Sequence, residues 1–448
     1  MKATFHNTSI KGIYTIVPPK VIDIDSELDT IYKGDKKGLE RIKKVIGLQT
    51  RHIAEAHITA SDLGLQAATR LLESLEVERD SIDALIFVTQ SPDYFCPASA
   101  CYLQGKLGLS QSCLSFDINQ ACAGYLYGLY VAHSLCDSGS ANRVLLIVGD
   151  TLSKFVNPLD SNLAPMMGDG VSATLLERSN NFGHSACGDF LGNATPTSLR
   201  RMSNLQVWIS PTATSPHSLT LHNPKNSPTI LECQDSSDTE SRADFNNSTN
   251  TTAEVSLSEQ SAKSIKETTQ LKHYFELGSD GSKFHQLIIP QGACRIPTKE
   301  IITDSKVWQT SESRSLKDLY MDGAEIFNFA IQKEPRAFKA FFEYAKDNVA
   351  DIDYFFFHQA NKYIVDNITR SLGLPKEKVP NSTTNKYGNL SGCSIPATIC
   401  DTLAELASNG LDSPLRVHLA GFGAGLAWGN AVVTLAKGFR CQKVGIYE

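Results

Sequence analysis

The sequence predicts an α/β protein made of two similar halves, with two stacked β-sheets and helices between and outside them. Two observations lead to this prediction. Apolar runs of five or six residues alternate with helical stretches, which is typical of buried parallel strands. The same order of landmarks also occurs twice along the 448-residue chain, which indicates an internal repeat.

The first half, residues 1–178, alternates predicted helices with predicted apolar strands. In chain order these are a helix at 61–76, a strand at 81–90, a helix ending at Leu107, a strand at 113–118, a helix at 124–135 and a strand at 143–148. The Gly168-Asp169-Gly170 segment that follows is interpreted as a structural turn.

The second half, residues 272–448, presents the same order. Its elements are a helix at 337–348, a strand at 351–358, a helix ending at Leu372, a segment at 379–384, a helix at 395–406 and a strand at 415–419. Glycines recur at 421–429, but no ribose-binding acid follows them, so we do not interpret them as a dinucleotide motif.

Residues 179–271 differ in composition from both halves. They are rich in Ser, Thr and Asn and show no clear periodicity. Such a segment buries too little apolar surface to offset its ordering entropy, so we expect a flexible surface insertion. Short apolar pieces at 205–209, 218–221 and 229–231 could form a small strand cluster.

Composition excludes several functional classes. The net charge is −6 without a basic block, which argues against nucleic-acid or membrane-surface binding. No apolar stretch reaches the length of a membrane span, and the N-terminus has no signal core, so we expect a cytoplasmic protein. The eleven cysteines include no C-x-x-C pair, so neither disulfides nor a metal site is expected.

Cys122 is the candidate nucleophile. It lies between a predicted strand and a predicted helix, where unpaired N–H groups and the helix dipole favour the thiolate form. The small neighbours Ala121, Ala123 and Gly124 leave room for an acyl group. The alternative is that Cys122 is simply a small buried residue.

Two further residues occupy related positions in the second half. His358 ends an apolar strand, and Asn389 stands at the helix start equivalent to that of Cys122. Strand ends and helix starts line the ligand crevice of parallel α/β sheets, so all three can converge about a pseudo-twofold axis. Alternatively, His358 is a core histidine and Asn389 a helix N-cap.

Such a trio could perform acyl chemistry on thioesters. Cys122 would accept the acyl group. His358 and Asn389 would donate hydrogen bonds to a malonyl thioester carbonyl as carbon dioxide leaves. The backbone N–H groups of Cys122 and Ala424 could then form the oxyanion hole for the attacked acyl carbonyl.

The motifs resemble those of the β-ketoacyl-acyl-carrier-protein synthase III family, over residues 1–178 and 272–448. The resemblance implies a thiolase-like αβαβα fold, a homodimer and Cys-His-Asn catalysis. It also implies acyl-CoA and malonyl-ACP or malonyl-CoA as substrates, with no tightly bound cofactor. The matching motifs are Gly47-Leu-Gln-Thr-Arg51, Ala121-Cys-Ala-Gly124, Gly168-Asp-Gly170, His358-Gln-Ala-Asn361, Tyr387-Gly-Asn-Leu-Ser391 and Gly421-Phe-Gly-Ala-Gly425.

The resemblance also assigns binding residues. The carrier-protein or pantetheine-binding stretch corresponds to Gln359, Ala360, Asn361, Lys362 and Tyr363, and the acyl pocket or its gate to Cys96 and Phe422. The chain departs from the family pattern at Arg41, Val45, Asn328, Tyr363 and Cys96.

Three functions remain open from the sequence. The leading hypothesis is a condensing enzyme that makes a 3-oxoacyl thioester by decarboxylative Claisen chemistry. The second is acyl transfer to an alcohol or amine without decarboxylation. The third is a binding or scaffold subunit that acts through the insertion.

Overall fold

The computed structural model describes residues 1–179, 220–221, 229–230, 272–299 and 315–448. The chain divides into two compact units, Met1–Asn180 with Gln270–Glu448 and Asn181–Thr269. The first unit contains both predicted halves. In the second, β9 (Thr220–Leu221) and β10 (Thr229–Ile230) pair antiparallel, so two of the three short apolar pieces do form strands. The predicted flexibility of the insertion otherwise lies outside the described residues.

The strands of the first half lie in the order β6-β5-β7-β8-β2. They are β2 (Thr8–Val17), β5 (Ala84–Val88), β6 (Leu114–Ile118), β7 (Arg143–Asp150) and β8 (Gly170–Arg178). β5 is parallel to β6 and β7, as predicted, whereas β8 is antiparallel to β7 and β2. No α-helix lies in the described residues between β7 and β8, whereas parallel neighbours are usually joined through a helical crossover.

The second half has a similar arrangement, in the order β14-β15-β16-β11-β1. The strands are β1 (Lys2–Phe5), β11 (His273–Ser279), β14 (Tyr354–Phe357), β15 (Leu415–Gly423) and β16 (Ala427–Cys441). Four of them have counterparts in the first half. β14 corresponds to β5, β15 to β7, β16 to β8 and β11 to β2. Residues 379–384 form no strand equivalent to β6 and lead instead into α10 (Thr383–Tyr387).

The two sheets are continuous with one another. Near its end, β16 pairs in parallel with β2 at Leu435, Arg440 and Cys441, with an irregularity in register between Leu435 and Arg440. β17 (Gly445–Ile446) also pairs with β2. The expected two sheets therefore form one 11-stranded sheet whose halves face one another.

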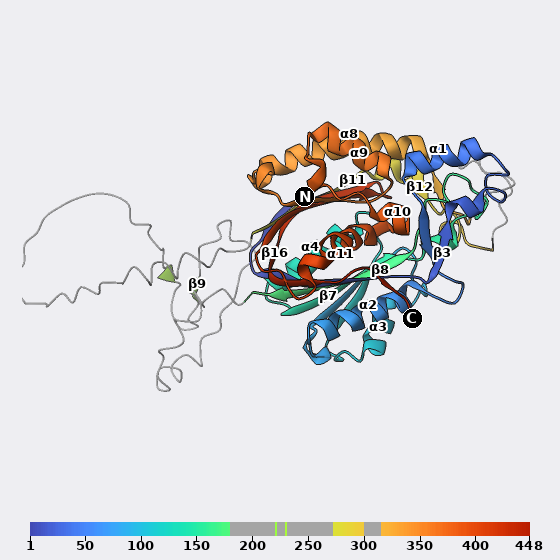
Figure 1. Ribbon diagram of the computed structural model, residues 1–448. Coiled ribbons are helices and arrows are strands. Elements are labelled where there is room, and N and C mark those ends of the chain that lie inside the picture. Colours follow the sequence, from blue (N-terminus) through green and yellow to red (C-terminus); the bar gives the residue numbers. More distant parts are fainter. Residues whose placement is uncertain (180–219, 222–228, 231–271, 300–314) are drawn as a thin grey trace, which may run out of the picture. The chain divides into compact units, whose positions relative to one another are not determined.

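Helices complete the predicted layers (Figure 1). The outer face of the first sheet is covered by α2 (Ala60–Ser74) and α3 (Ser99–Leu107), and that of the second by α8 (Gly323–Ala345) and α9 (Lys362–Leu372). Between the sheets lie α4 (Gly124–Asp137) and α11 (Ser394–Ala407), in the largest apolar cluster. The layered sandwich is therefore confirmed.

Matching helix ends support the internal repeat. α3 ends at Gly108 and α9 at Gly373, and both glycines have a left-handed backbone with φ of 65° and 66°. This conformation closes a helix at little steric cost only for glycine. The repeated Leu-Gly-Leu sequence thus has the same structural cause in both halves.

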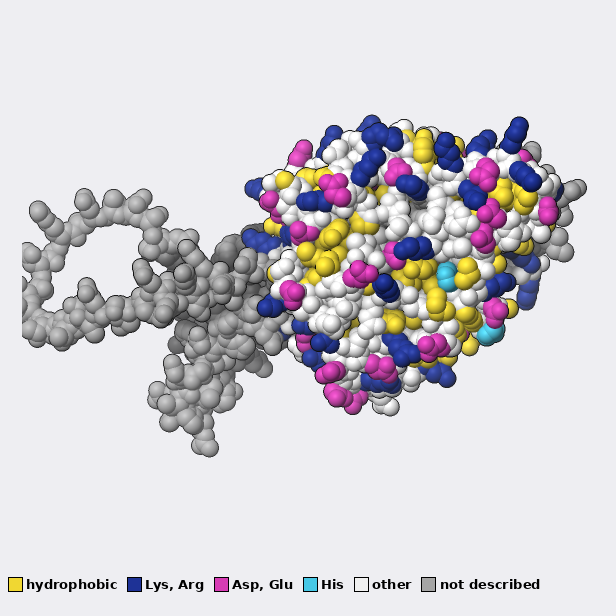
Figure 2. Space-filling view, viewed as in Figure 1, with side chains coloured by type: hydrophobic (Ala, Val, Ile, Leu, Met, Phe, Trp, Pro, Cys, Tyr) yellow, Lys and Arg dark blue, Asp and Glu magenta, His cyan; other side chains and the backbone are white. Residues whose placement is uncertain are grey.

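The remaining elements lie around this core. They are β3 (Lys20–Asp23), α1 (Lys36–Ile46), β4 (Thr50–Ile53), β12 (Leu287–Ile288) and β13 (Tyr320–Met321). Figure 2 shows acidic and basic side chains interspersed over the visible face of the described core. Within the described parts of the chain, no helix has the length and apolar character needed to cross a bilayer.

Candidate active site

Cys122 lies between β6 and α4, as predicted, and its side chain is half-buried. The end of β15 packs directly against it. A β-carbon placed on Gly423 would lie 2.7 Å from the Cys122 Cβ and 2.9 Å from its Sγ, and one on Gly421 would lie 3.0 Å from its carbonyl oxygen. Only glycine allows the 421–425 backbone to come this close to the sulfur.

The surroundings of Cys122 favour the thiol and not the thiolate. Desolvation is the main cause and raises the pKa of Cys122 to about 12, since protein atoms crowd a side chain that keeps some solvent exposure. Asp150 raises the pKa further, whereas the Ser391 hydroxyl and the backbone N–H of Cys122 lower it. The expected preference for thiolate at the helix start is therefore wrong for the resting protein, because burial outweighs it.

His358 follows β14 and is 1% exposed. Its Nδ1 lies 2.6 Å from the Ser394 Oγ, and that oxygen also accepts the Gln359 backbone N–H at 3.3 Å. Since Ser394 already accepts one hydrogen bond, its own proton is free to point at Nδ1. In that tautomer Nε2 carries the proton and can donate it to a carbonyl.

Burial also controls the charge of His358. It lowers the pKa of the imidazole to about 3, while the Ser391 carbonyl acts in the opposite direction. The ring is therefore neutral near pH 7. The ring of Phe422 meets it edge-on with 5.6 Å between centroids. Phe422 is itself 3% exposed within an apolar cluster, and its assignment to the acyl pocket stays a prediction.

Asn389 is held by the first half of the chain. Its backbone N–H donates to the Met166 carbonyl at 2.8 Å, and its carbonyl accepts the Gly168 N–H at 3.1 Å. A β-carbon on Gly168 would lie 2.0 Å from the Tyr387 oxygen, so the Gly168-Asp-Gly170 motif lets the two halves approach. The Oδ1 atom accepts the Ser391 N–H at 3.0 Å. No described residue accepts a hydrogen bond from Nδ2, so its protons can face a substrate.

One residue contacts all three candidates. Ser391 binds Asn389 through its N–H, faces the His358 ring with its carbonyl, and lies beside the Cys122 thiol with its hydroxyl. The structure therefore brings Cys122, His358 and Asn389 together around Ser391. Sequence reasoning treated Ser391 only as a neighbour of Asn389 and did not single out Ser394; their positions beside the Asn389 helix start were the available signal.

Ala424 begins the turn between β15 and β16, directly after Gly423. Ala424 therefore follows directly on the residue whose backbone packs against the Cys122 sulfur. The oxyanion role of the Cys122 and Ala424 N–H groups remains a prediction.

The 359–363 stretch divides into buried and exposed parts. Gln359 is fully buried and donates to the carbonyls of Phe357 and Pro380. Ala360 is half-buried, and Asn361 caps α9 by accepting the Ile364 N–H at 2.8 Å.

Lys362 and Tyr363 are the exposed members of that stretch. Lys362 pairs with Asp366 at 2.9 Å, and the Tyr363 ring stacks on that of Phe327 with 5.6 Å between centroids. Within the stretch, these two are the side chains that can meet a carrier from solution.

Cys96 and the positions that depart from the family pattern lie at the surface. Cys96 is exposed in the loop between β5 and α3, and Arg41 and Val45 are exposed on α1. The proposed gating role of Cys96 is neither supported nor contradicted by this position.

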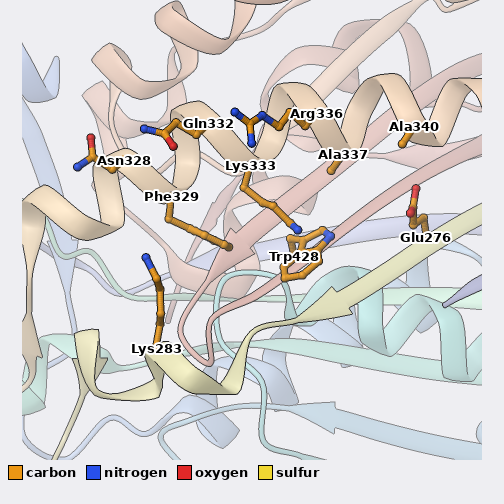
Figure 3. A pocket seen from close by; sticks show the side chains of 10 residues that line it. All are labelled: Glu276, Lys283, Asn328, Phe329, Gln332, Lys333, Arg336, Ala337, Ala340 and Trp428. Carbon is orange, nitrogen blue, oxygen red and sulfur yellow. The ribbon is translucent and has the colours of Figure 1, made fainter.

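A pocket of about 420 Å³ lies beneath α8, apart from the candidate site (Figure 3). α8 supplies most of its lining, including Lys333 and Arg336, and Trp428 closes one side with the Lys333 Nζ 3.7 Å from the centre of its ring. None of Cys122, His358 and Asn389 lines it. In the part of the chain that the structure describes, no group of three or more His, Cys, Asp or Glu could hold a metal ion.

Two repeated half-sheets with Cys, His and Asn at their junction define a thiolase-like protein. A Burkholderia xenovorans LB400 3-oxoacyl-(acyl-carrier protein) synthase has a similar structure, with a TM-score of 0.72 and 27% identity over 100% of this chain and 99% of that one. A structure of a Xanthomonas campestris OleA variant, at 18% identity and a TM-score of 0.62 over 96% of this chain and 97% of that one, shares the fold.

Sequence comparisons give the family. The model of 3-oxoacyl-[acyl-carrier-protein] synthase III matches residues 116–191, and that of its C-terminal part matches residues 342–435. A Campylobacter jejuni protein named only provisionally as 3-oxoacyl-[acyl-carrier-protein] synthase 3 is 41% identical over 100% of this chain and 99% of its own. A Rhodopirellula baltica β-ketoacyl-[acyl-carrier-protein] synthase III is 32% identical over 86% of this chain and 87% of its own. The chain belongs to the 3-oxoacyl-[acyl-carrier-protein] synthase III family of condensing enzymes.

Proposed function

We propose that the protein loads an acyl group from a thioester onto Cys122 and condenses it with a malonyl thioester. Loss of carbon dioxide produces the enolate that attacks the acyl-Cys carbonyl, and the product is a 3-oxoacyl thioester. The observation that carries this proposal is the meeting of Cys122, His358 and Asn389 around Ser391.

The protonation and hydrogen bonding of each catalytic group suit the reaction step proposed for it. The neutral His358 and the unengaged Nδ2 of Asn389 are hydrogen-bond donors, which is what a developing enolate oxygen needs. The N–H groups of Cys122 and Ala424 would stabilise the tetrahedral oxyanion in the acylation and condensation steps. Removing one such donor from an oxyanion hole typically lowers kcat by about 10²- to 10³-fold.

The substrates follow from the reaction type. We propose acyl-CoA as the acyl donor and malonyl-ACP or malonyl-CoA as the extender, with no tightly bound cofactor, in the cytoplasm. The exposed Lys362 and Tyr363, beside the basic helix α1, would meet an acidic carrier protein. The edge position of β6, where Leu114 is 51% exposed, supports a homodimer.

Mass measurement of the intact protein tests the loading step. After incubation with acetyl-CoA, hexanoyl-CoA or decanoyl-CoA, we expect a mass increase equal to one acyl group, mapped to Cys122 and absent from Cys122→Ala. Failure of all three donors to label Cys122 would contradict the proposal.

Labelled malonyl-CoA and malonyl-ACP test the condensation step. We expect release of labelled carbon dioxide that depends on His358 and Asn389 and accompanies a 3-oxoacyl product. Formation of an ester or amide without release of carbon dioxide would instead indicate simple acyl transfer.

A further inference from the structure

The pocket beneath α8 is built from three separate parts of the chain. Its sides are α8, the strands β11 and β16, and the 3₁₀ segment Gly281–Gln286. Its volume of about 420 Å³ lies within the range of small-molecule sites. The pocket therefore has the size of a ligand site, and it is separate from the three catalytic candidates.

Trp428 forms a flat wall of this pocket. It is paired with Gly278 across β16 and β11, and a β-carbon on Gly278 would overlap the Trp428 ring. Glycine at position 278 thus lets the indole lie across the neighbouring strand. The α8 residues Ala337 and Ala340 also line the pocket. Because these side chains are small, the helix leaves the space above the indole open.

Two cations of α8 line the pocket without an anionic partner. The Lys333 ammonium lies 3.7 Å from the centre of the Trp428 ring, and this attraction holds it at the wall. Arg336, almost one helical turn further on, is exposed. Within the described residues, neither side chain forms a hydrogen bond or an ion pair. Figure 3 shows Phe329 and Lys333 reaching from α8 toward Trp428.

The other charged residues of the lining indicate the charge of a ligand. Lys283 is neutralised by Glu325, whose carboxylate lies 3.2 Å from its ammonium. Glu276 lines the pocket beside Trp428. Asp280 interacts with both lysines but is not part of the lining. Two unpaired cations and one carboxylate leave a single net positive charge. This balance suits a monoanion better than a phosphate ester with two charges, which Glu276 would repel.

The uncharged lining suits an apolar body next to that anion. The Phe329 ring stands edge-on to Trp428, with 6.2 Å between centroids. The amide side chains of Asn328 and Gln332 are exposed at the rim. A mainly apolar surface with a few convergent polar groups is the usual composition of a small-ligand site.

We propose that this pocket binds a small monocarboxylate that carries an aromatic or other apolar body. Arg336 and Lys333 hold the carboxylate, which a guanidinium can bind through two parallel hydrogen bonds. The apolar body lies against Phe329, Ala337 and Ala340. Binding at this site does not require acyl chemistry at Cys122, so the proposal stands apart from the proposed function.

The pocket and the candidate active site share one turn of the chain. Trp428 is the register partner of Phe422. Leu426 exchanges two backbone hydrogen bonds with Asp280, at 2.7 and 3.1 Å. A ligand that rests against Trp428 therefore also restrains the 421–425 turn, which packs against the candidate nucleophile.

Three probes of one shape test the recognition of the anion. The binding of 3-phenylpropanoate, 3-phenylpropan-1-ol and 3-phenylpropylamine to the full chain is measured by ligand-observed NMR in low salt, where screening is weak. We expect the carboxylate to bind about tenfold more tightly than the alcohol, because charge-assisted hydrogen bonds are lost in the alcohol. Equal binding of the carboxylate and the alcohol, or tighter binding of the amine, would overturn the proposal.

Substitutions on α8 locate the site. Arg336→Ala and Lys333→Met should each raise the Kd of 3-phenylpropanoate about fivefold or more. Lys339→Ala is the matched control, because Lys339 is an exposed cation of the same helix that does not line the pocket. It should bind the probe like the wild type. Wild-type affinity in both Arg336→Ala and Lys333→Met, or an equal loss in Lys339→Ala, would place the probe elsewhere.

Hydrogen exchange tests the link to the shared turn. With saturating 3-phenylpropanoate, amides of residues 421–428 and of α8 should exchange more slowly in the wild type, and this protection should be lost in Arg336→Ala. Binding that leaves the exchange of residues 421–428 unchanged would contradict the restraint of the turn.

Discussion

Gly423 and Cys122 are in direct contact, and this contact joins the two halves of the chain at the candidate nucleophile. A β-carbon on Gly423 would lie 2.9 Å from the Cys122 sulfur. The backbone of the second half therefore forms one wall of the site carried by the first half. The glycine-rich motif is required here for close approach and not for binding a nucleotide.

Gly423→Ala should lower acyl loading of Cys122 by at least 100-fold. The new methyl group would overlap the Cβ and Sγ of Cys122 and displace the neighbouring Ala424 N–H. Overpacking of this kind also destabilises a protein by about 1–3 kcal/mol. Quenched-flow loading and chemical denaturation measure the two effects separately.

Gly105→Ala is the matched control for that substitution. Gly105 lies within α3, and a β-carbon there would have no neighbour within 4 Å. We expect unchanged loading and a gain of about 0.5–1 kcal/mol in the free energy of unfolding. Equal losses of loading in both variants would show that the Gly423 contact has no special role.

Ser394→Ala should impair condensation more than loading. The hydroxyl of Ser394 lies 2.6 Å from the His358 Nδ1, and its loss removes the partner that keeps the Nε2 proton toward the substrate. Release of carbon dioxide from malonyl thioester should fall about 10- to 100-fold, whereas acyl-Cys122 should form at nearly the wild-type rate. A variant that loses both steps equally would place Ser394 in the general support of the fold.

The sequence was sufficient for the elements that depend on periodicity and on local residues. The strand before Cys122 and the helix ends at Gly108 and Gly373 follow from such patterns. The antiparallel direction of β8 and the joining of β16 to β2 depend on pairings between distant residues, which single-sequence patterns do not encode.

The protonation state of Cys122 could not be predicted for a related reason. The local sequence shows the helix start that favours a thiolate, but desolvation comes from elements far away in the chain, including the 421–423 backbone. Ser391 illustrates the same limit. Its contacts depend on a positive φ and on Cys122 and His358, two neighbours from separate segments.

Acid should destabilise the protein partly through His418. Burial lowers the pKa of His418 to about 3, well below its value of about 6.5 in an unfolded chain. Below pH 6.5 the unfolded state binds a proton that the folded state rejects, so stability falls as pH falls toward 3.

The contribution of His418 to the pH dependence of the free energy of unfolding can be measured with one variant. His418→Gln retains a donor for the Asn430 Oδ1, which lies 2.8 Å from the His418 Nε2. The wild type should lose about 1.4 kcal/mol more per pH unit than the variant between pH 5.5 and 4, as measured by urea denaturation. Parallel stability curves for the two proteins would contradict the assignment.

A short linker should be able to replace the insertion. The Ser179 N–H donates to the Asn7 carbonyl at 2.8 Å, and His273 pairs with Phe5 in the sheet. Both ends of the insertion are thus anchored to residues 5–7, so a Gly/Ser linker of about ten residues, spanning up to ~30 Å, can connect them. We expect unchanged loading and thermal stability after replacement of residues 181–269. Loss of a partner complex with retained loading would reveal a separate binding role for the insertion.

The pairing of β2 with β16 and β17 has a consequence for biogenesis. β2 lies within the first 17 residues, but its neighbours on one side include Leu435, Arg440 and Ile446. Since a ribosome releases the chain from its N-terminus, this strand keeps an open, aggregation-prone edge until residues 435–446 have emerged. Nascent chains stalled before residue 435 should therefore remain protease-sensitive and depend on chaperones.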